Sequence, residues 1–421
     1  MTLDIVSGGP AGGSAAPATI IGLATLAGMA FAGANLGPLW RELAGRVEAD
    51  PADAAALMDL AIIKQLTGDR DSGLSLQAEA LRLKRVYHRP APAAAVKGLR
   101  LLAFMVPGDF MANTPLDFLL AESGVTLDQL YIAPGLPAPE RVPEHDVAIV
   151  AIGQSDESRA ALAKVAEVVR TWQRPVLNAP AGIDRLAREE AWRQFGSLPG
   201  VVMMPTARLD RALLERMAQG SLAVDAALPD GAYPLIIRPI GSHAGRGLDR
   251  IDGQAPLASY LAQHAQGEFY LSRFVDYRSA DGHFRKYRIT LIDGKPYACH
   301  MAISDHWMIH YLNAGMHEST AKRAEEARFM AGFDTGFARR HQQALAGLAE
   351  RAGLEYFAID CGELPDGRLL VFEADVAMIV HAMDPADLFP YKLDQMRKVF
   401  AAFTAMLGRC GGVSRPKAAA R

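Results

Sequence analysis

The sequence contains few cysteines, little net charge and no long uninterrupted apolar run. The three cysteines, Cys299, Cys361 and Cys410, are odd in number and widely spaced. They indicate neither a disulfide framework nor a zinc site, and they are typical of a protein in a reducing cytoplasm. The formal net charge of −3 over 421 residues argues against nucleic acid as a partner, because nucleic-acid-binding domains are usually strongly basic.

The N-terminal part lacks charge altogether between residues 5 and 40, and it contains the apolar run IIGLATLAGMAF. No Lys or Arg precedes this run, and its length falls short of the roughly 20 residues that a membrane span needs. Glycines and Thr25 dilute it further. We therefore expect a buried helix and no membrane partner; the alternative is a membrane anchor.

The length and the changing periodicity predict several domains. A chain of 421 residues is too long for one typical core, so two or three domains are expected. The apolar spacing predicts a helical region over 15–90. Short strands that alternate with helices predict a small parallel α/β domain over 98–206, and the segment RPAPAAAVKG reads as the linker between the two. A further helix, a glycine-rich loop and several hairpins predict an α+β domain over 207–410.

Within the helical region, helices are expected at about 17–34 and 38–48, followed by the stretch DPADAAALMDLAIIKQLTGDRDSGLSLQAEALRLK. Leu60 would lie in its first helix, Gly68 and Asp69 in its turn, and Gly73 and Ala80 in its second helix. This stretch resembles a tetratricopeptide repeat. One such repeat cannot bury its apolar face alone, so the preceding helices are expected to stack on it. Two roles are open: a docking surface for a protein partner, or a packed helical cap on the rest of the chain.

The stretch YFAIDCGELPDGRLLVFEADV (356–376) reads as two apolar strands that nevertheless carry carboxylates. Asp366 and Gly367 predict a two-residue type I′ turn, which would place Asp360 directly opposite Glu373. Asp375 lies two residues further along and points to the same face. Converging carboxylates repel one another, and a bound Mg²⁺ or Ca²⁺ is the simplest compensation for an all-oxygen site. The alternative is a solvated face with acids scattered by chance.

The stretch PLIIRPIGSHAGRGLDRI predicts a buried strand that leads into a glycine-rich loop. Gly241, Gly245 and Gly247 would let backbone amides approach a phosphate closely. Arg238, at the end of the strand, would add a fixed positive charge beside that anion. The loop has neither the Walker A spacing nor the dinucleotide-binding fingerprint.

A second hairpin is predicted by IDGKP, with Asp293 and Gly294 as its turn. Lys286 and Arg288 alternate onto one face of its first strand. Two cations on a strand face are often simply solvated. Here they stand between a phosphate-type loop and a carboxylate hairpin, and this order of elements suits a metal-bound triphosphate.

At this point the sequence resembles a known superfamily. Residues from about 99 to 405 are similar to ATP-grasp proteins, nearest to glutathione synthetases and the ligases that modify ribosomal protein S6. The resemblance rests on VLNAP, LIIRPIGSHAGRGL, YLSRFVDY, DGHFRKYRITLIDGKP, YLNAGM and IDCGELPDGRLLVFEADV, in this order. It implies a fold of the class α/β plus α+β, with an ATP-grasp domain after a small parallel α/β domain and an all-α helical repeat region.

The resemblance also implies roles for individual residues. Arg288 would be the catalytic residue, and Asp360, Glu373 and Asp375 the metal ligands. The ATP-binding residues would be Arg238, Gly241, Ser242, His243, Gly245, Gly247, Arg273, Phe274, Val275, Asp276 and Asn313. The substrate-binding residues would be His306, Trp307, His310 and Tyr311.

Several positions depart from the pattern of the superfamily. Arg238 stands where Lys is usual, and an upstream Lys has only Arg208 as a loose counterpart. Lys286 stands where an acid commonly precedes the phosphate-contacting Arg by two residues. Asp375 stands where the third metal ligand is often Asn, and it adds a negative charge. Because Arg is a rigid fork and Lys a point charge, the geometry of the phosphates is expected to differ.

The chemistry that the resemblance implies is the activation of a carboxylate. ATP, bridged by two Mg²⁺ ions or by Mn²⁺, would phosphorylate a carboxylate to an acyl phosphate, and an amine would then displace phosphate. The substrates would be amino acids or peptides, with His310 as an acceptor of the amine proton. A small-molecule kinase is one alternative, and a nucleotide-binding scaffold whose helical repeats hold a partner is another. A homo-oligomer is compatible with each of these three functions.

Overall fold

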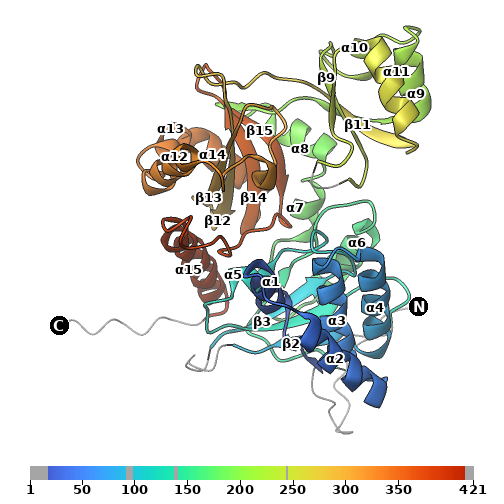
Figure 1. The fold of residues 1–421 in the computed structure, drawn as a ribbon, viewed down its shortest axis with the longest axis vertical. Helices are drawn as coiled ribbons and strands as arrows, with labels where there is room; N and C mark the ends of the chain where they lie inside the picture. Colours follow the sequence, from blue (N-terminus) through green and yellow to red (C-terminus); the bar gives the residue numbers. More distant parts are fainter. Residues whose placement is uncertain (1–17, 92–97, 137–140, 243–244, 413–421) are drawn as a thin grey trace, which may run out of the picture. The chain divides into compact units, whose positions relative to one another are not determined.

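The computed structural model describes residues 18–91, 98–136, 141–242 and 245–412. The chain divides into two compact units, one formed by 1–183 with 376–421 and the other by 184–375. Figure 1 shows the helices and strands of both. The predicted boundaries at 90, 98, 206 and 207 lie inside these units and stay predictions.

The first unit is built on a six-stranded sheet in the order β1-β2-β4-β3-β5-β6. Its strands are β1 (Ala18–Thr19), β2 (Val86–Arg89), β3 (Arg100–Met105), β4 (Thr126–Tyr131), β5 (Val147–Val150) and β6 (Val176–Leu177). Only the β2–β4 pair among these neighbours is antiparallel. The parallel arrangement expected for β3–β6 is confirmed. The helical region expected over 15–90 is wrong at both ends, because β1 and β2 are strands of the sheet.

Four helices connect β1 to β2: α1 (Leu23–Phe31), α2 (Gly37–Ala49), α3 (Ala54–Leu66) and α4 (Arg70–Leu83). Asp53 and Asp69 begin the last two, because each carboxylate accepts a hydrogen bond from a backbone amide of the first turn. Gly73 lets α4 approach α3 closely, since a Cβ at this position would lie 2.8 Å from the carbonyl oxygen of Ala61. A helical hairpin is therefore present where one was expected, and its assignment as a tetratricopeptide repeat stays a prediction.

The helical region packs onto one end of the sheet (Figure 1). Met58 and Leu81 belong to the same apolar cluster as Tyr87 and Tyr131 of the sheet, and the two tyrosine rings meet edge to face at 5.9 Å. Burial of side chains of this size stabilises the contact by about 1.5–3 kcal/mol each. The helices thus cover the sheet as a cap, and a docking role stays a prediction.

The remaining helices of this unit are α5 (Leu116–Leu119), α6 (Arg159–Val169) and α15 (Lys392–Cys410), and α7 (Pro180–Asp184) ends at its boundary. Among all the described residues, no helix combines the length and the apolar character needed to cross a membrane.

The second unit begins with α8 (Arg188–Phe195) and contains two sheets. The first is antiparallel, in the order β10-β9-β11-β8, with β8 (Thr206–Asp210), β9 (Leu235–Pro239), β10 (Asp249–Ile251) and β11 (Glu268–Arg273). Helices α9 (Arg211–Ala218), α10 (Val224–Ala227) and α11 (Gln254–Gln263) belong to the same lobe. Its apolar cluster includes Leu214, Leu257 and Ile237. Because side chains alternate along a strand, Arg238 points away from the core that Ile237 enters.

The second sheet has the order β13-β12-β14-β15-β7. Its strands are β7 (Val201–Val202), β12 (Phe284–Ile292), β13 (Lys295–Ser304), β14 (Tyr356–Glu363) and β15 (Leu369–Asp375). Helices α12 (Thr320–Ala331), α13 (Phe337–Arg340) and α14 (Gln342–Ala352) complete this lobe. Asp293 and Gly294, with φ of 50° and 74°, form the two-residue turn expected between β12 and β13.

The β14–β15 hairpin reaches the predicted register by a different route. The amide of Leu364 donates to the carbonyl of Arg368 at 2.9 Å, so the loop holds three residues instead of two, and of the two predicted turn residues only Gly367 has positive φ. A β-bulge next to Asp360 then shifts the register by one residue. The longer loop and the bulge offset each other. Asp360 therefore lies directly opposite Glu373, as predicted.

Candidate functional site

Asp360 is the most deeply buried charged group of this site. Its side chain is 2% exposed. Arg288 lies opposite it on β12 and donates from Nε to Oδ1 at 2.8 Å and from Nη2 to Oδ2 at 2.9 Å. Lys286 donates from Nζ to Oδ2 at 2.9 Å. Burial alone would raise the pKa of Asp360, but the two cations hold this pKa far below its ordinary value. The side chain is thus a permanent anion.

Glu373, on the neighbouring strand, is bound by a residue that the sequence analysis did not predict. Arg188, the first residue of α8, donates from Nη2 to its Oε2. Burial opposes ionisation, but the charge of Arg188 keeps the pKa of Glu373 below its ordinary value, against the repulsion from Asp360. Arg238 and Lys286 also attract this carboxylate. We call Asp360 and Glu373 the carboxylate pair.

The cations around the pair come from both lobes of the second unit. Arg188 begins α8, Arg238 is the last residue but one of β9, and Lys286 and Arg288 share one face of β12. We call these four side chains the basic cluster. Its members outnumber the carboxylate pair by two charges, and by one charge if Asp375 is counted. Since Lys286 and Arg288 are 15% and 17% exposed, solvent screens this excess incompletely.

The predicted metal ligands are only partly brought together. Asp375 ends β15 opposite Ala358. Burial raises the pKa of Tyr356, and Cys299 and Asp375 raise it further. Both oxygens of Asp360 already accept hydrogen bonds from cations. In the part of the chain that the structure describes, no three side chains of the metal-ligating types gather closely enough to hold a metal ion. As arranged, these residues do not fit a three-carboxylate metal site, and the predicted metal role stays a prediction.

The glycine-rich loop follows the end of β9, a few residues after Arg238. Gly241, Gly245 and Gly247 have φ of 72°, 74° and 65°, a region that glycine enters without strain. Arg238 donates from Nε to Oγ of Ser242 at 3.3 Å and from Nη2 to the Ser242 carbonyl oxygen. Burial, with the nearby charge of Arg188, lowers the pKa of Arg238 to about 10. The guanidinium stays charged at neutral pH and ties the loop to β9.

His243, also predicted to bind ATP, lies with residue 244 outside the described residues. The described part of the loop approaches a second segment, 305–313. A Cβ on Gly245 would lie 3.5 Å from Sδ of Met308. The loop and this segment therefore border the same space.

Of the four predicted substrate residues, His310 lies nearest to the charged groups. Burial lowers its pKa, and the charges of Lys286 and Arg288 lower it further. Tyr311 donates its hydroxyl to buried Glu326 at 3.0 Å. The Oδ1 of Asn313 accepts from the His310 amide at 2.9 Å and so closes the 3₁₀ turn η1 (Tyr311–Asn313). His310 is therefore placed by its neighbours, and it is neutral near pH 7.

The other predicted contacts form a separate group. Trp307 meets the ring of Phe274 edge to face at 5.7 Å, and the Arg250 guanidinium stacks on Phe274 at 4.4 Å. Asp276 is ion-paired with Arg278 at 2.7 Å, so a ribose hydroxyl would have to share its carboxylate. Five of the predicted residues are exposed and Val275 is half-buried; the exposed ones are Gly241, Arg273, Asp276, His306 and Asn313.

Sequence reasoning missed three residues of this region. Arg188 is 185 positions from Glu373, and nothing in its helix marks it. His300 lies opposite Arg288 because a β-bulge between Arg288 and the next residue shifts the register. Glu326 is fully buried, and nothing in the sequence of its charge-rich helix, which also carries Glu325 and Arg328, distinguishes it.

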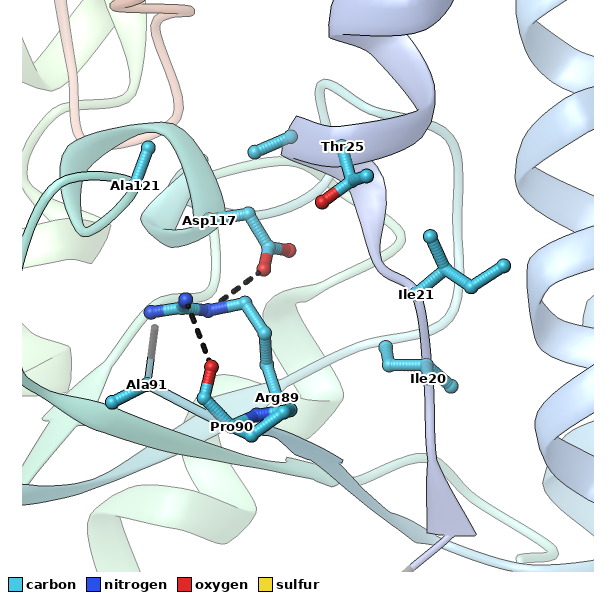
Figure 2. A pocket seen from close by; sticks show the side chains of 9 residues that line it. Ile20, Ile21, Thr25, Arg89, Pro90, Ala91, Asp117 and Ala121 are labelled. Atoms are coloured by element: carbon cyan, nitrogen blue, oxygen red, sulfur yellow. Dashed lines mark hydrogen bonds and ion pairs between the residues drawn. The ribbon is translucent and has the colours of Figure 1, made fainter. Parts of the chain in front are cut away.

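A separate cavity lies within the first unit and contains none of the predicted site residues. Its volume is about 540 Å³. It is lined by Ile20, Ile21, Ala24, Thr25, Arg89, Pro90, Ala91, Asp117 and Ala121. Figure 2 shows Arg89 and Asp117 pointing toward each other, with Nε and Oδ1 3.3 Å apart. The two charges neutralise each other, and the pair ties the end of β2 to α5.

Comparison with known proteins finds distant likenesses among solved structures. A RimK-domain ATP-grasp protein from Sphaerobacter thermophilus is 14% identical, with a TM-score of 0.39 over 73% of this chain and 99% of that one. A D-alanine–D-alanine ligase from Bacillus anthracis, solved with ATP, is 12% identical, with a TM-score of 0.44 over 76% and 100%. The VanG D-Ala:D-Ser ligase from Enterococcus faecalis is 10% identical, with a TM-score of 0.45 over 75% and 99%. No family model and no curated protein matches the sequence. Because these likenesses are distant, function has to be inferred from the side chains of the site.

Proposed function

We propose that this protein is an ATP-dependent ligase that activates a carboxylate as an acyl phosphate and joins it to an amine. The observation that carries the proposal is the basic cluster, whose four cations outnumber the neighbouring carboxylates beside the glycine-rich loop, even when Asp375 is counted. A buried excess of positive charge is costly unless an anion occupies it. A triphosphate supplies that anion, and the amides around Gly241 and Gly245 suit its oxygens.

The residues of the site divide the work of phosphoryl transfer between them. An oxygen of the substrate carboxylate attacks the γ-phosphorus, the bond to the β,γ-bridging oxygen breaks, and ADP leaves. Arg238 and Arg288 stabilise the charge that spreads over the transferring group. Asp360 holds Arg288 by two hydrogen bonds and Ser242 holds Arg238, so little reorganisation is needed when charge develops.

The second step forms the new bond to the amine. The amine nitrogen attacks the acyl carbon, inorganic phosphate leaves, and the nitrogen must lose a proton. His310 is neutral because burial and the neighbouring cations lower its pKa, so it is able to accept this proton. Trp307, which packs on Phe274, would bound the same space with an apolar wall.

The substrates are proposed as an amino acid or short peptide carboxylate and an amine. Two of the similar solved structures are ligases named for joining D-alanine to D-alanine or to D-serine. Mg²⁺, or Mn²⁺ in its place, is expected with ATP from the resemblance of the sequence. No step is assigned to the metal, because the predicted carboxylates do not form a metal site as arranged.

The test is a screen for ADP release over amino acids and short peptides, repeated with hydroxylamine. An acyl phosphate gives a hydroxamate and free phosphate, whereas the product of a kinase retains its phosphate. Arg288→Met should lose turnover. The matched control is Arg368→Met, which should keep it, because Arg368 is an exposed arginine next to the loop of the β14–β15 hairpin. Release of ADP without hydroxamate or free phosphate would favour the kinase.

A further inference from the structure

The position of Lys286 disagrees with the metal site that the sequence resemblance implies. An acid is usual at this position, and it would add a third carboxylate beside the carboxylate pair. Here the ammonium group of Lys286 lies 2.9 Å from Oδ2 of Asp360, and Arg288 holds both oxygens of the same carboxylate. Asp360 therefore receives from the chain the positive charge that a divalent ion would supply.

We infer that Lys286, together with Arg288, replaces a divalent cation at Asp360, so that this site holds the phosphates of a nucleotide with a weak dependence on Mg²⁺. The inference rests on the proposed function, because it presumes that a nucleotide binds here. The ligand class is a nucleoside triphosphate or another polyphosphate.

Charge counting explains why the dependence on Mg²⁺ should be weak. Replacing the expected acid by lysine changes the local charge by two units in favour of an anion. At the low exposure of Lys286, a unit charge about 4 Å away interacts far more strongly than in bulk water. The same two units repel a free divalent ion. The nucleotide-free protein should thus bind divalent ions poorly and still bind polyphosphate.

The experiment measures the dissociation constant of the non-hydrolysable analogue β,γ-imido-ATP by calorimetry, in EDTA and in excess MgCl₂. For the wild-type protein we expect the two constants to differ by less than about tenfold, whereas a difference of about a hundredfold or more is expected for Lys286→Glu. Lys286→Gln, which is less disruptive to the fold, should fall between them. Lys295→Gln, an exposed lysine at the turn of the same hairpin, is the matched control and should behave like the wild type.

A second readout uses Mn²⁺ alone, followed by electron paramagnetic resonance on the nucleotide-free protein. Wild type is expected to bind Mn²⁺ at least about tenfold more weakly than Lys286→Glu, in which three carboxylates face one another. Thermal melts of each variant show that it is folded.

The outcomes separate this inference from the proposed function. If the wild-type protein binds the analogue only with MgCl₂, and Lys286→Gln shows the same ratio, the inference is overturned while the proposed function stands. If the analogue binds under neither condition, both are overturned. Wild-type protein that binds Mn²⁺ as tightly as Lys286→Glu also contradicts the inference.

Discussion

Asp360→Asn should strongly destabilise the second unit, because it removes the carboxylate that accepts hydrogen bonds from two poorly exposed cations of the ladder. The side chain of Asp360 is 2% exposed, and those of Lys286 and Arg288 are 15% and 17% exposed. Three charge-assisted hydrogen bonds of 2.8–2.9 Å end on its two oxygens. Asparagine offers one oxygen, and its amide group would face a guanidinium or an ammonium as a second donor.

The magnitude follows from this burial. Removing one partner of a buried ion pair costs about 3–5 kcal/mol, because the remaining charge stays desolvated without compensation. We expect Asp360→Asn to lower the free energy of unfolding by this amount, measured by urea denaturation with circular dichroism. Lys286→Met in the Asp360→Asn background should restore part of the loss, since it removes one of the two uncompensated cations.

The control is Asp366→Asn in the loop of the same hairpin. Asp366 is also ion-paired with an arginine, but the two side chains are 51% and 55% exposed. Water screens this pair, so the pair contributes little to the free energy of unfolding. The urea midpoint of Asp366→Asn should therefore equal that of the wild-type protein. If Asp360→Asn left the midpoint as unchanged as Asp366→Asn does, Asp360 would be an ordinary solvated acid, and the reasoning on the basic cluster would fail.

Three further outcomes are expected. Glu373→Ala should abolish ATP-dependent turnover while circular dichroism stays native, because it removes a charge next to the basic cluster; retained turnover would contradict the site. Burial raises the pKa of Asp59 to about 6, so the folded protein binds a proton at Asp59 more readily than the unfolded protein does. The stability of wild type relative to Asp59→Asn should therefore fall by about 2 kcal/mol as the pH rises from about 4 to about 7, and a flat difference would contradict this. Gly73→Ala should lower the free energy of unfolding by about 1–3 kcal/mol, because the new methyl group would lie 2.8 Å from the carbonyl oxygen of Ala61. The control is Gly45→Ala, whose methyl group would meet no atom within 4 Å and should stabilise its helix by about 0.5–1 kcal/mol.

The sequence predicts the elements of the second unit well where the pattern is local. The dipeptide Asp293-Gly294 is enough to predict the turn between β12 and β13, because both of its residues must adopt positive φ and these residue types do so readily. The pairing of Asp360 with Glu373 is also correct, although the reasoning behind it missed a longer loop and a bulge that offset each other. The alternation of apolar residues along a strand does not reveal where a bulge occurs. The second bulge, after Arg288, places His300 opposite Arg288, a pairing that the turn alone does not predict.

Long-range contacts account for what the sequence did not predict. Arg188 reaches Glu373 only because α8 packs beside β15, and no spacing rule connects positions so far apart. Strand β2 pairs with β1, which lies before the four helices, and with β4, which comes later in the chain, so its four residues read as the end of a helix. Lys286 is visible as a departure from a familiar pattern, but its bond to Asp360 depends on the register of β12 and β14.

The central claim is that the basic cluster and the glycine-rich loop hold the phosphates of ATP. Hydrogen exchange of the wild-type protein, measured with and without ATP, tests it most directly. We predict slower exchange of backbone amides in 235–242, 284–292 and 369–375 when ATP is added, and unchanged exchange in Gly37–Ala49, the second helix of the first unit. Unchanged exchange in all three segments at saturating ATP, or protection confined to the first unit, would contradict the claim.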